Sequence, residues 1–589
     1  MDELKKLRAI FTHKQKADSL VLLIYIVIGT AFELLGVSMI LPVINSILDK
    51  DIILEKEPYK SVAGLLGIDN PNTFVFVLLM SLIVLYIVKN IYLIFMYNRQ
   101  YKYIYSNMRF LSTKLMRFYL GQSYSYHKKK NSSELLRNVN QDVADFFGTI
   151  QALVFLATEG LTVTALIIYL FIKDKTITIA VGFILAILVL LFLKVYKKHL
   201  GLMGQKNRFF EAQVNKWVQQ AFNGIKEVKV MNKEDFFFRK YDEAFAGRVK
   251  SEYTYHTMVS IPKPVIEAGA MCSLLGAISI KLLLGVNTHY FIPTISIFAV
   301  ASIRMLPSFN RITEYLGTIS YQKAAITSIY NDFLEMKEVE KSQNGGLERS
   351  KKKLSLKEVL HLQNVSFHYD DSDRMILDDI SFDIKKNTSV AFIGQSGAGK
   401  TTLADIILGV LEPSDGQILA DDINIEDKLD EWHNAIGYIP QNIYLMDDTI
   451  ARNVAFGLSD EEIDMERLER ACQRAQLTDT LKDLPDGLNT VVGEHGVRFS
   501  GGQRQRIGIA RALYNEPEIL ILDEATSALD NETEAAVMEA IDALHGEMTL
   551  IVIAHRLSTI RNCDFVYKIG KGKAQLQPKG AYQGNDIRK

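Results

Sequence analysis

The stretch "GQSGAGKTT", Gly394 to Thr402, has glycines, a lysine and hydroxyls at the spacing of a phosphate-binding loop. It follows the predicted strand "SVAFI" and precedes a segment with helical periodicity. In that context the glycines let backbone N–H groups turn toward a phosphate, and the helix start adds its positive end. Lys400 is expected to reach β- and γ-phosphate oxygens, and Thr401 to offer its hydroxyl to Mg²⁺. The nucleotide-binding residues of this loop are predicted to be Gly394, Ser396, Gly397, Ala398, Gly399, Lys400, Thr401 and Thr402.

A second motif, "EILILDEATSALD", places two carboxylates at the end of an apolar strand pattern. Asp523 is positioned to hold Mg²⁺ through water. Glu524 is positioned to orient or deprotonate a water molecule for in-line attack on a γ-phosphate. An acidic pair at a strand end otherwise usually caps a helix, but together with the phosphate loop it predicts ATP hydrolysis.

Between these motifs lies "RFSGGQRQRIGIARAL", and with it the chain resembles the ATP-binding cassette (ABC) family, whose signature is LSGGQ ahead of a helix. Phe499 replaces the usual leucine at an apolar packing position, so we expect a mild effect. The residues that match the signature are Ser500, Gly501, Gly502 and Gln503.

The resemblance implies roles for four further residues. Tyr369 in "VSFHYDD" matches the aromatic residue that stacks on adenine, and Gln441 in "IGYIPQNIYL" matches the loop glutamine that touches Mg²⁺. Asp530 matches the loop that crosses the dimer interface, and His555 matches the switch histidine near the γ-phosphate. The implied catalytic pair is Glu524 with His555, and the implied metal-contacting set is Thr401, Gln441 and Asp523.

In this family the signature donors bind a γ-phosphate held by the other subunit's phosphate loop. Ser500 and its glycines provide those donors at a helix N-terminus. Because one chain carries one such domain, the resemblance implies a homodimer that closes around two ATP molecules. Glu524 is present in each copy, so both sites are expected to hydrolyse ATP.

The elements that position these motifs divide the 589 residues into two contrasting parts. Short β-branched runs alternate with helical ones in the second part, which predicts an α/β phosphate-loop domain. The first part holds stretches of about 20 apolar residues, the length that a membrane span needs. The expected fold is a type IV exporter-like membrane domain over 1–335, a linker over 336–357 and a nucleotide-binding domain over 358–589. Six spans are predicted at 19–48, 73–97, 150–172, 176–194, 264–286 and 291–312.

Two long polar segments rich in lysine and arginine follow the second and fourth spans, which predicts that they lie in the cytoplasm. The protein is thus expected to be a multi-pass protein of the inner (plasma) membrane, with a cytoplasmic nucleotide-binding domain and an uncleaved N-terminus. The polar turns "NSSELLRNVNQDV" and "FNGIKEVKVMNKEDFF" resemble coupling helices of the family, although plain solvated helix tips also fit. The external segment 49–72 fits either a short amphipathic helix or a structured loop.

Charges within the predicted spans point to the cargo, because intramembrane charge is costly and normally faces a cavity. At about 1.5 Å per residue, Arg304 lies about 20 Å and Lys89 about 24 Å down their helices from the external ends. One interpretation is that they snorkel or pair with Glu267; Glu33 and Glu159 are further acidic partners. The other is a cationic site for an anionic head group, with Pro307 turning Arg304 toward the cavity. The predicted substrate residues are Lys89, Lys263, Arg304 and Arg311.

The patterns "RMLPSFNRI" and "IPKPVIEAG" resemble lipid-linked oligosaccharide flippases of the PglK type. This implies ATP-driven flipping of a polyprenyl-pyrophosphate-linked glycan from the inner to the outer leaflet. A multidrug or other lipid exporter is the alternative, and an ATP-gated channel or regulator is a third. The net charge of −1 and the spans argue against a nucleic-acid partner. The three distant cysteines predict neither a disulfide framework nor a zinc site.

Overall fold

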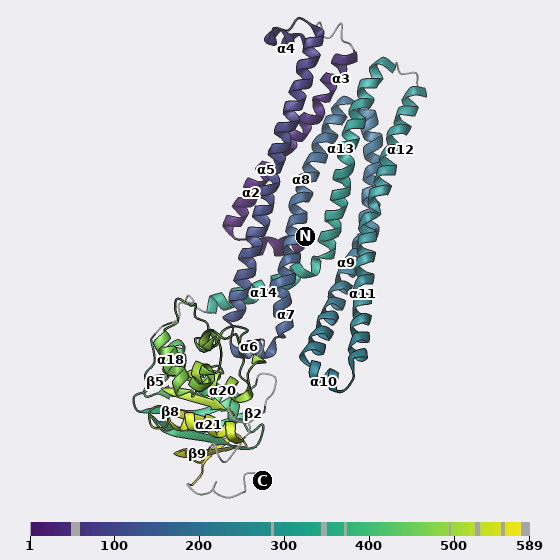
Figure 1. The fold of residues 1–589 in the computed structure, drawn as a ribbon. Helices are drawn as coiled ribbons and strands as arrows, with labels where there is room; N and C mark the ends of the chain where they lie inside the picture. The colour runs from purple at the N-terminus through teal and green to yellow at the C-terminus, as the bar shows by residue number, and fades with distance from the viewer. Residues whose placement is uncertain are drawn as a thin grey trace. The chain divides into compact units, whose positions relative to one another are not determined.

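The computed structural model separates into two compact units that we describe one at a time (Figure 1). The helical unit comprises Met1–Gln122 and Lys130–Asn344, and the α/β unit comprises Ser123–Lys129 and Gly345–Lys589. The structure describes residues 2–48, 59–283, 288–342, 350, 352–369, 374–493, 496–524, 531–554 and 560–578.

Long helices that extend well beyond the apolar stretches form the helical unit. Its elements are α1 (Asp2–Ile10), α2 (His13–Ser38), α3 (Ile40–Leu48), α4 (Tyr59–Leu66), α5 (Pro71–Leu120), α7 (Ser132–Arg137), the π-helix η2 (Asn138–Asp142), α8 (Val143–Lys173), α9 (Lys175–Asn223), α10 (Ile225–Val230), α11 (Glu234–Ser260), α12 (Pro262–Leu283), α13 (Thr288–Tyr321) and α14 (Lys323–Ser342).

The described residues of each of the six predicted spans are helical, except that Met39 divides the first span between α2 and α3; residues 284–286 of the fifth span lie outside the described residues. Within the described residues, four helical stretches are long and apolar enough to cross a membrane: His13–Ile47, Pro71–Leu120, Ser132–Lys173 and Glu234–Gly276. The two other predicted spans lie in α9 and α13, each of which includes side chains outside the described set. The described part of the predicted external segment contains the helix α4.

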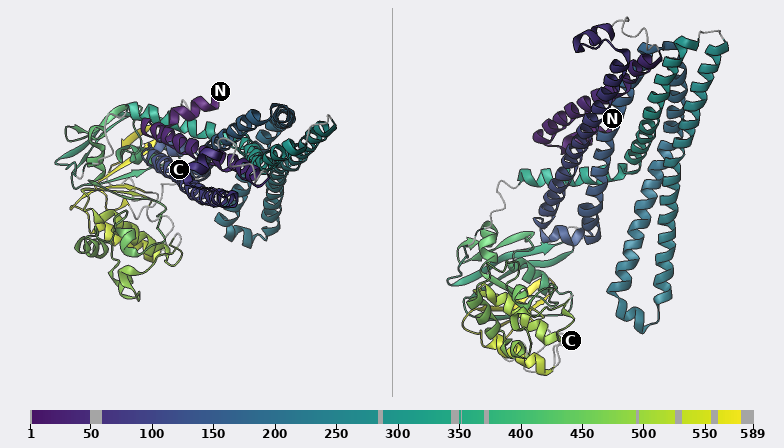
Figure 2. Two further views of the ribbon diagram at one scale, coloured as in Figure 1. Left: turned by 90° about the horizontal axis from the view of Figure 1, so that it is seen from above. Right: turned by 45° about the horizontal axis from the view of Figure 1, so that its top comes forward.

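Local sequence signals account for several boundaries of these helices. Thr12 begins α2 with a capping box in which its side chain and that of Gln15 bond each other's backbone N–H. Asp174 separates α8 from α9 and caps α9 by accepting a hydrogen bond from the Ile177 N–H, which produces the tight hairpin expected at "KDKT". Figure 2 shows α14 running across the long helices rather than alongside them.

Helices distant in sequence lie side by side in this unit, with α13 against α8, α2 against α5, and α9 alongside both α11 and α12, which follow each other end to end (Figure 1). The short helix α10 turns the chain between α9 and α11 (Figure 1). This packing brings the charged residues of α2, α5, α8 and α13 into one region.

The α/β unit contains short strands alternating with helices, as the sequence predicts. Its elements are α6 (Tyr124–Lys129), β1 (Val359–His368), β2 (Met375–Lys385), β3 (Ser389–Ile393), α15 (Lys400–Ile407), β4 (Asp415–Ala420), β5 (Ile423–Asn424), the 3₁₀ helix η3 (Ile425–Lys428), α16 (Leu429–His433), β6 (Ile436–Ile439), α17 (Ile450–Val454), α18 (Met465–Arg474), α19 (Thr478–Lys482), the 3₁₀ helix η4 (Gly487–Asn489), α20 (Gly501–Tyr514), β7 (Ile519–Asp523), α21 (Asn531–Asp542), β8 (Thr549–Ile553), β9 (Phe565–Gly570) and β10 (Lys573–Leu576).

Two sheets organise the described residues of this unit. One has the strand order β2-β1-β4-β5 with antiparallel pairing, and the other has the order β10-β9-β3-β8-β7-β6. In the second sheet β3, β6, β7, β8 and β9 run parallel, and β10 pairs antiparallel with β9. Strands β3, β7 and β8 are buried along their whole length, which explains their unbroken apolar sequences.

The parallel sheet brings the sequence motifs to one edge. The phosphate loop follows β3, Gln441 follows β6, and Asp523 ends β7. Strands β3, β8, β7 and β6 are consecutive neighbours, so their carboxyl ends lie along the same edge. Ligands of open α/β sheets bind at that edge.

Candidate functional site

The phosphate loop has a backbone that its glycines make possible. Gly397 and Gly399 have φ values of +77° and +101°, a region that L side chains rarely adopt. A Cβ at Gly394 would collide with the carbonyl oxygen of Ile569, and one at Gly399 would come within 2.9 Å of Leu377. The loop therefore approaches its neighbours closely, and it turns tightly enough for the Ala398 N–H to donate to the Gln395 carbonyl oxygen at 3.1 Å.

Lys400 begins α15 and folds back over this loop. Its Nζ donates to the carbonyl oxygens of Gly394 at 3.0 Å and Gln395 at 3.1 Å. Burial lowers the pKa of Lys400, while the carboxylates of Glu524 and Asp523 act in the opposite direction. The ammonium thus faces the acidic pair within the α/β unit.

The second motif forms the acidic side of the site. Glu524 has a positive φ of +46°, and its Oε2 accepts a hydrogen bond of 2.7 Å from Gln441 Nε2. Asp523 is buried, and burial together with the charges of Glu524 and Asp405 raises its pKa to about 6. The structure therefore brings Lys400, Gln441, Asp523 and Glu524 together, as the sequence predicts.

Asp405, on α15, is a residue that the sequence analysis missed. It is buried, and burial raises its pKa while Lys128 opposes that shift. The sequence does not distinguish Asp405 from other polar residues in helices, and only the fold shows that its charge acts on Asp523.

Tyr369 lies at the end of β1 beside the phosphate-loop helix. Its hydroxyl is 3.3 Å from Thr402 Oγ1, and its ring contacts Phe367 edge-on at a centroid distance of 5.0 Å. The α6 residue Lys128 lies over the same ring at 5.5 Å from the centroid and pairs with Asp405 at 3.8 Å. Tyr369 is thus fixed in place beside the start of α15.

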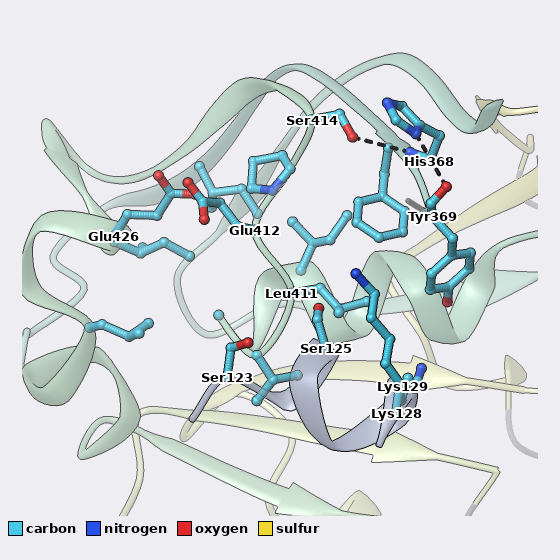
Figure 3. A pocket seen from close by; sticks show the side chains of 18 residues that line it. Ser123, Ser125, Lys128, Lys129, His368, Tyr369, Leu411, Glu412, Ser414 and Glu426 are labelled. Atoms are coloured by element: carbon cyan, nitrogen blue, oxygen red, sulfur yellow. Dashed lines mark hydrogen bonds between the residues drawn. The ribbon is translucent and has the colours of Figure 1, made fainter. Parts of the chain in front are cut away.

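A cavity of about 1140 Å³ adjoins Tyr369 (Figure 3). Its lining includes Ser123, Ser125, Lys128 and Lys129 from α6 and the turn before it, opposite Leu411 and Glu412. The short helix "YSYHKK" therefore belongs to the α/β unit. The segment 131–143, which resembles a coupling helix, forms α7, η2 and the first residue of α8 in the helical unit.

The signature begins α20. Ser500 caps this helix by accepting from the Gln503 N–H at 3.2 Å, while Gln503 Oε1 accepts from the Ser500 N–H at 2.9 Å. Ser500 is exposed and Gly502 is buried. Phe499 belongs to the hydrophobic core and is 6% exposed, which agrees with an apolar packing role. The other predicted site residues Asp530 and His555 lie outside the described residues.

Within the helical unit, the intramembrane charges form pairs. Glu33 of α2 accepts two hydrogen bonds from Arg304 of α13, from Nη2 to Oε1 at 2.7 Å and from Nε to Oε2 at 2.9 Å. Lys89 of α5 donates to Oε2 of the same carboxylate at 3.2 Å. Arg304 and Lys89 therefore have an internal partner, and it is Glu33 rather than Glu267.

The two other predicted substrate residues differ from each other. Arg311 Nε donates to Glu159 Oε1 at 2.7 Å, and the second oxygen of that buried carboxylate has no hydrogen-bond partner in the described structure. Lys263 and Glu267 are both exposed, and neither forms an ion pair among the described residues. The structure brings together Lys89, Arg304 and Glu33 and leaves Lys263 apart from that group.

Comparison with known proteins agrees with both halves of this structure. The family described as "ABC transporter" matches residues 377–527, and the "ABC transporter transmembrane region" matches residues 19–302. The ATP-dependent lipid A-core flippase of Cupriavidus pinatubonensis is 35% identical over 461 residues, covering 77% of this chain and 75% of that protein. The chain belongs to the ABC transporter family. ATP hydrolysis in this transporter is accordingly coupled to transport.

Further relatives and one solved structure extend this comparison. The lipid A-core flippase of Nitrosococcus oceani is 30% identical over 450 residues, covering 76% of this transporter and 74% of the relative. The structure of a bacterial Atm1-family ABC exporter with ATP bound has a TM-score of 0.71 at 21% identity, covering 96% and 97% of the two chains. The fold is therefore that of an ABC exporter, with a helical membrane domain fused to an α/β nucleotide-binding domain.

Proposed function

We propose that this ABC transporter is an ATP-driven flippase for a polyprenyl-pyrophosphate-linked oligosaccharide, working as a homodimer in the inner membrane. The cargo would enter from the cytoplasmic leaflet and leave in the outer leaflet. The observation that carries the cargo class is the excess of cations over carboxylates in the paired groups of the apolar helices. Lys89, Arg304 and Arg311 bear three positive charges against two on Glu33 and Glu159.

The arrangement suits a phosphorylated head group because a guanidinium offers two parallel N–H donors to neighbouring oxygens. Arg304 already binds a carboxylate with that geometry. Its side chain is 27% exposed, whereas that of Glu33 is 5% exposed. The arginine therefore retains an accessible face toward a ligand.

The proposed ATP site uses Mg²⁺, which would supply charge neutralisation at the transferred phosphate. The residues present fit that ion because Asp523 is buried beside the half-buried carboxylate of Glu524, and a cation relieves the repulsion between the two charges. Thr401 and Gln441 complete the proposed oxygen ligands. Lys400 exchanges its loop carbonyls for phosphate oxygens, and Glu524 accepts the proton of the attacking water.

Two exposed surfaces support the homodimer. Ser500 presents the start of α20 to solvent, where a second copy's nucleotide would sit. The hairpin tip at α10 exposes Val230 at 74%, Met231 at 62% and Phe238 at 66%, an apolar surface that a second copy would cover. Mixed dimers with one Glu524→Gln copy test this arrangement. A homodimer whose two ATP sites close together predicts that their ATP turnover falls below the average of the two parent proteins, and an exact average would contradict that joint closure.

The cargo is tested by ATP-driven flipping in proteoliposomes. A fluorescent polyprenyl-pyrophosphate-linked glycan is expected to flip with wild-type protein, and an uncharged polyprenyl-linked glycan is the matched control. Equal flipping of both lipids would show that the transporter does not recognise the anionic head group. Flipping of neither lipid would contradict the proposed cargo.

A second candidate cargo is another lipid. The relatives at 35% and 30% identity are both named for lipid A-core, which favours a lipid over a soluble drug. Competition for flipping by added lipid A-core would favour this second cargo over the first.

A further inference from the structure

The buried carboxylate of Glu33 uses both of its oxygens. Oε1 accepts from Arg304 Nη2, and Oε2 accepts from Arg304 Nε and from Lys89 Nζ, at 2.7, 2.9 and 3.2 Å. The three residues come from three helices, α2, α5 and α13. This fork of donors around two neighbouring oxygens is the same geometry with which arginine binds phosphate.

The packing holds this arrangement in place. Lys89 is 9% exposed at its side chain, and its ammonium lies 4.5 Å from the ring centroid of Tyr86. Gly36, one turn after Glu33, lies beside the lysine, and a Cβ there would be in ordinary van der Waals contact with Lys89, 3.8 Å from Nζ. The lysine is therefore packed closely between α2 and Tyr86 while it reaches the carboxylate.

The charge of the group explains why a ligand would compete with Glu33. Two cations share one carboxylate, so the group keeps one positive charge in an apolar setting. A pyrophosphate brings more negative charge and more acceptor oxygens than one carboxylate. It is therefore the stronger partner for Arg304 and Lys89 wherever it can reach them.

We propose that Glu33 is an internal counter-anion that occupies the head-group site and is displaced from Arg304 and Lys89 when an anionic lipid binds. This inference rests on the proposed function, because it takes the pyrophosphate of the cargo as the displacing ligand. Glu33 keeps the cations paired while the site is without cargo. It also restricts the site to ligands that carry enough negative charge to replace it.

The test uses full-length protein in nanodiscs and measures binding of a dansyl-labelled polyprenyl pyrophosphate by fluorescence anisotropy. Dansyl-labelled polyprenol, which lacks the pyrophosphate, is the matched ligand. Glu33→Gln removes the competing charge and keeps the shape, and we expect about tenfold tighter binding of the pyrophosphate with unchanged binding of the polyprenol. Glu33→Asp keeps the charge and is expected to show no such gain.

Glu159→Gln is the matched control variant, because it removes a buried carboxylate that pairs with Arg311 and lies outside the Glu33 group. Its gain in pyrophosphate affinity is expected to be smaller than that of Glu33→Gln. Equal or weaker pyrophosphate binding by Glu33→Gln, with binding by wild type intact, would overturn the inference and leave the proposed cargo standing. Binding by neither protein would overturn both.

A second variant covers the case in which Glu33→Gln fails to fold. Glu33→Ala leaves space for an added carboxylate, and acetate can fill it. We expect acetate to weaken pyrophosphate binding to Glu33→Ala at least threefold more than to wild type, because it restores the competitor. A purely structural Glu33 predicts the reverse, namely that acetate improves binding by repairing the variant.

Discussion

At the residue scale, this transporter places opposite charges close together in two separate environments. In the ATP site, the charge of Lys400 interacts with those of Asp523 and Glu524. In the membrane helices, Arg304 and Lys89 form ion pairs with Glu33. In both places burial makes an unpaired charge costly, so the paired state is the stable one. Binding of a charged ligand at either place therefore means exchanging partners.

The role of Glu524 gives the first prediction. Glu524→Gln keeps the hydrogen-bonding shape beside Gln441 but removes the base. ATP turnover is expected to fall at least about 100-fold, the usual contribution of a general base. ATP binding, measured at equilibrium with a fluorescent analogue, is expected to persist. Turnover close to wild type would remove Glu524 from the catalytic role.

The pKa of Asp523, raised to about 6, predicts that ATPase activity declines on the acid side of its pH profile, which we call the acid limb. Mg²⁺ binds the ionised carboxylate, so protonation below pH 6 competes with the metal. Apparent Mg²⁺ affinity is expected to fall by up to about tenfold per pH unit below that value. Magnesium titrations of ATPase activity from pH 5 to 8 measure it.

Asp405→Asn provides the matched variant for this pH effect. The charge of Asp405 is one cause of the raised pKa of Asp523, so its removal lowers that pKa. The acid limb is expected to move to lower pH than in wild type. If the low-pH loss of activity stayed at the same pH or moved to higher pH, the assignment of that loss to protonation of Asp523 would be contradicted.

At the element scale, the parallel strands position the residues of the ATP site, and the long helices position the charged residues of the membrane domain. The sequence predicted the strands that carry the phosphate loop and Asp523, because buried parallel strands are short unbroken apolar runs. It also predicted the helices over the six spans. It did not predict that the helix "YSYHKK" belongs to the α/β unit, because a helix of six residues has no periodicity of its own.

The contact of α6 with Tyr369 yields an element-scale prediction. Lys128→Met removes the cation over the proposed adenine-stacking ring and the pair with Asp405. The KM for ATP is expected to rise about two- to fivefold, the range of one exposed cation–π contact. Steady-state ATPase assays measure it, with Lys129→Met on the same helix as the control. An equal rise in both variants would indicate a general charge effect.

Close packing of α9 on α13 gives a stability prediction. A Cβ at Gly204 would overlap the backbone carbonyl of Tyr321, whereas a Cβ at Gly160 in α8 meets nothing within 4 Å. Gly204→Ala is expected to lower the free energy of unfolding by about 1–3 kcal/mol. Gly160→Ala is expected to be neutral or stabilising, since alanine favours helix by about 1 kcal/mol. Thermal unfolding midpoints in detergent compare the two, and the reverse order would contradict this close packing of α9 on α13.

At the scale of the whole molecule, the division into a helical membrane domain and an α/β domain could be predicted from composition and motifs alone. The pairing of intramembrane charges could not, because it joins residues 271 positions apart, Glu33 and Arg304. The sequence predicted that Arg304 lies deep in its span and that Glu33 is one of three possible acidic partners, but spacing along separate helices does not reveal which residues meet. That partner choice depends on how α2, α5 and α13 pack.

The central claim is that Arg304 recognises the anionic head group of a lipid that the ATPase drives across the membrane. The most direct measurement is ATP-driven flipping of a fluorescent polyprenyl-pyrophosphate-linked glycan in proteoliposomes, with Arg304→Ala compared with wild type. Arg304→Lys, which keeps the charge but loses the fork, is the matched control. The account predicts flipping by wild type, partial flipping by Arg304→Lys and at least about a tenfold loss in Arg304→Ala. Equal flipping by wild type and Arg304→Ala would contradict it.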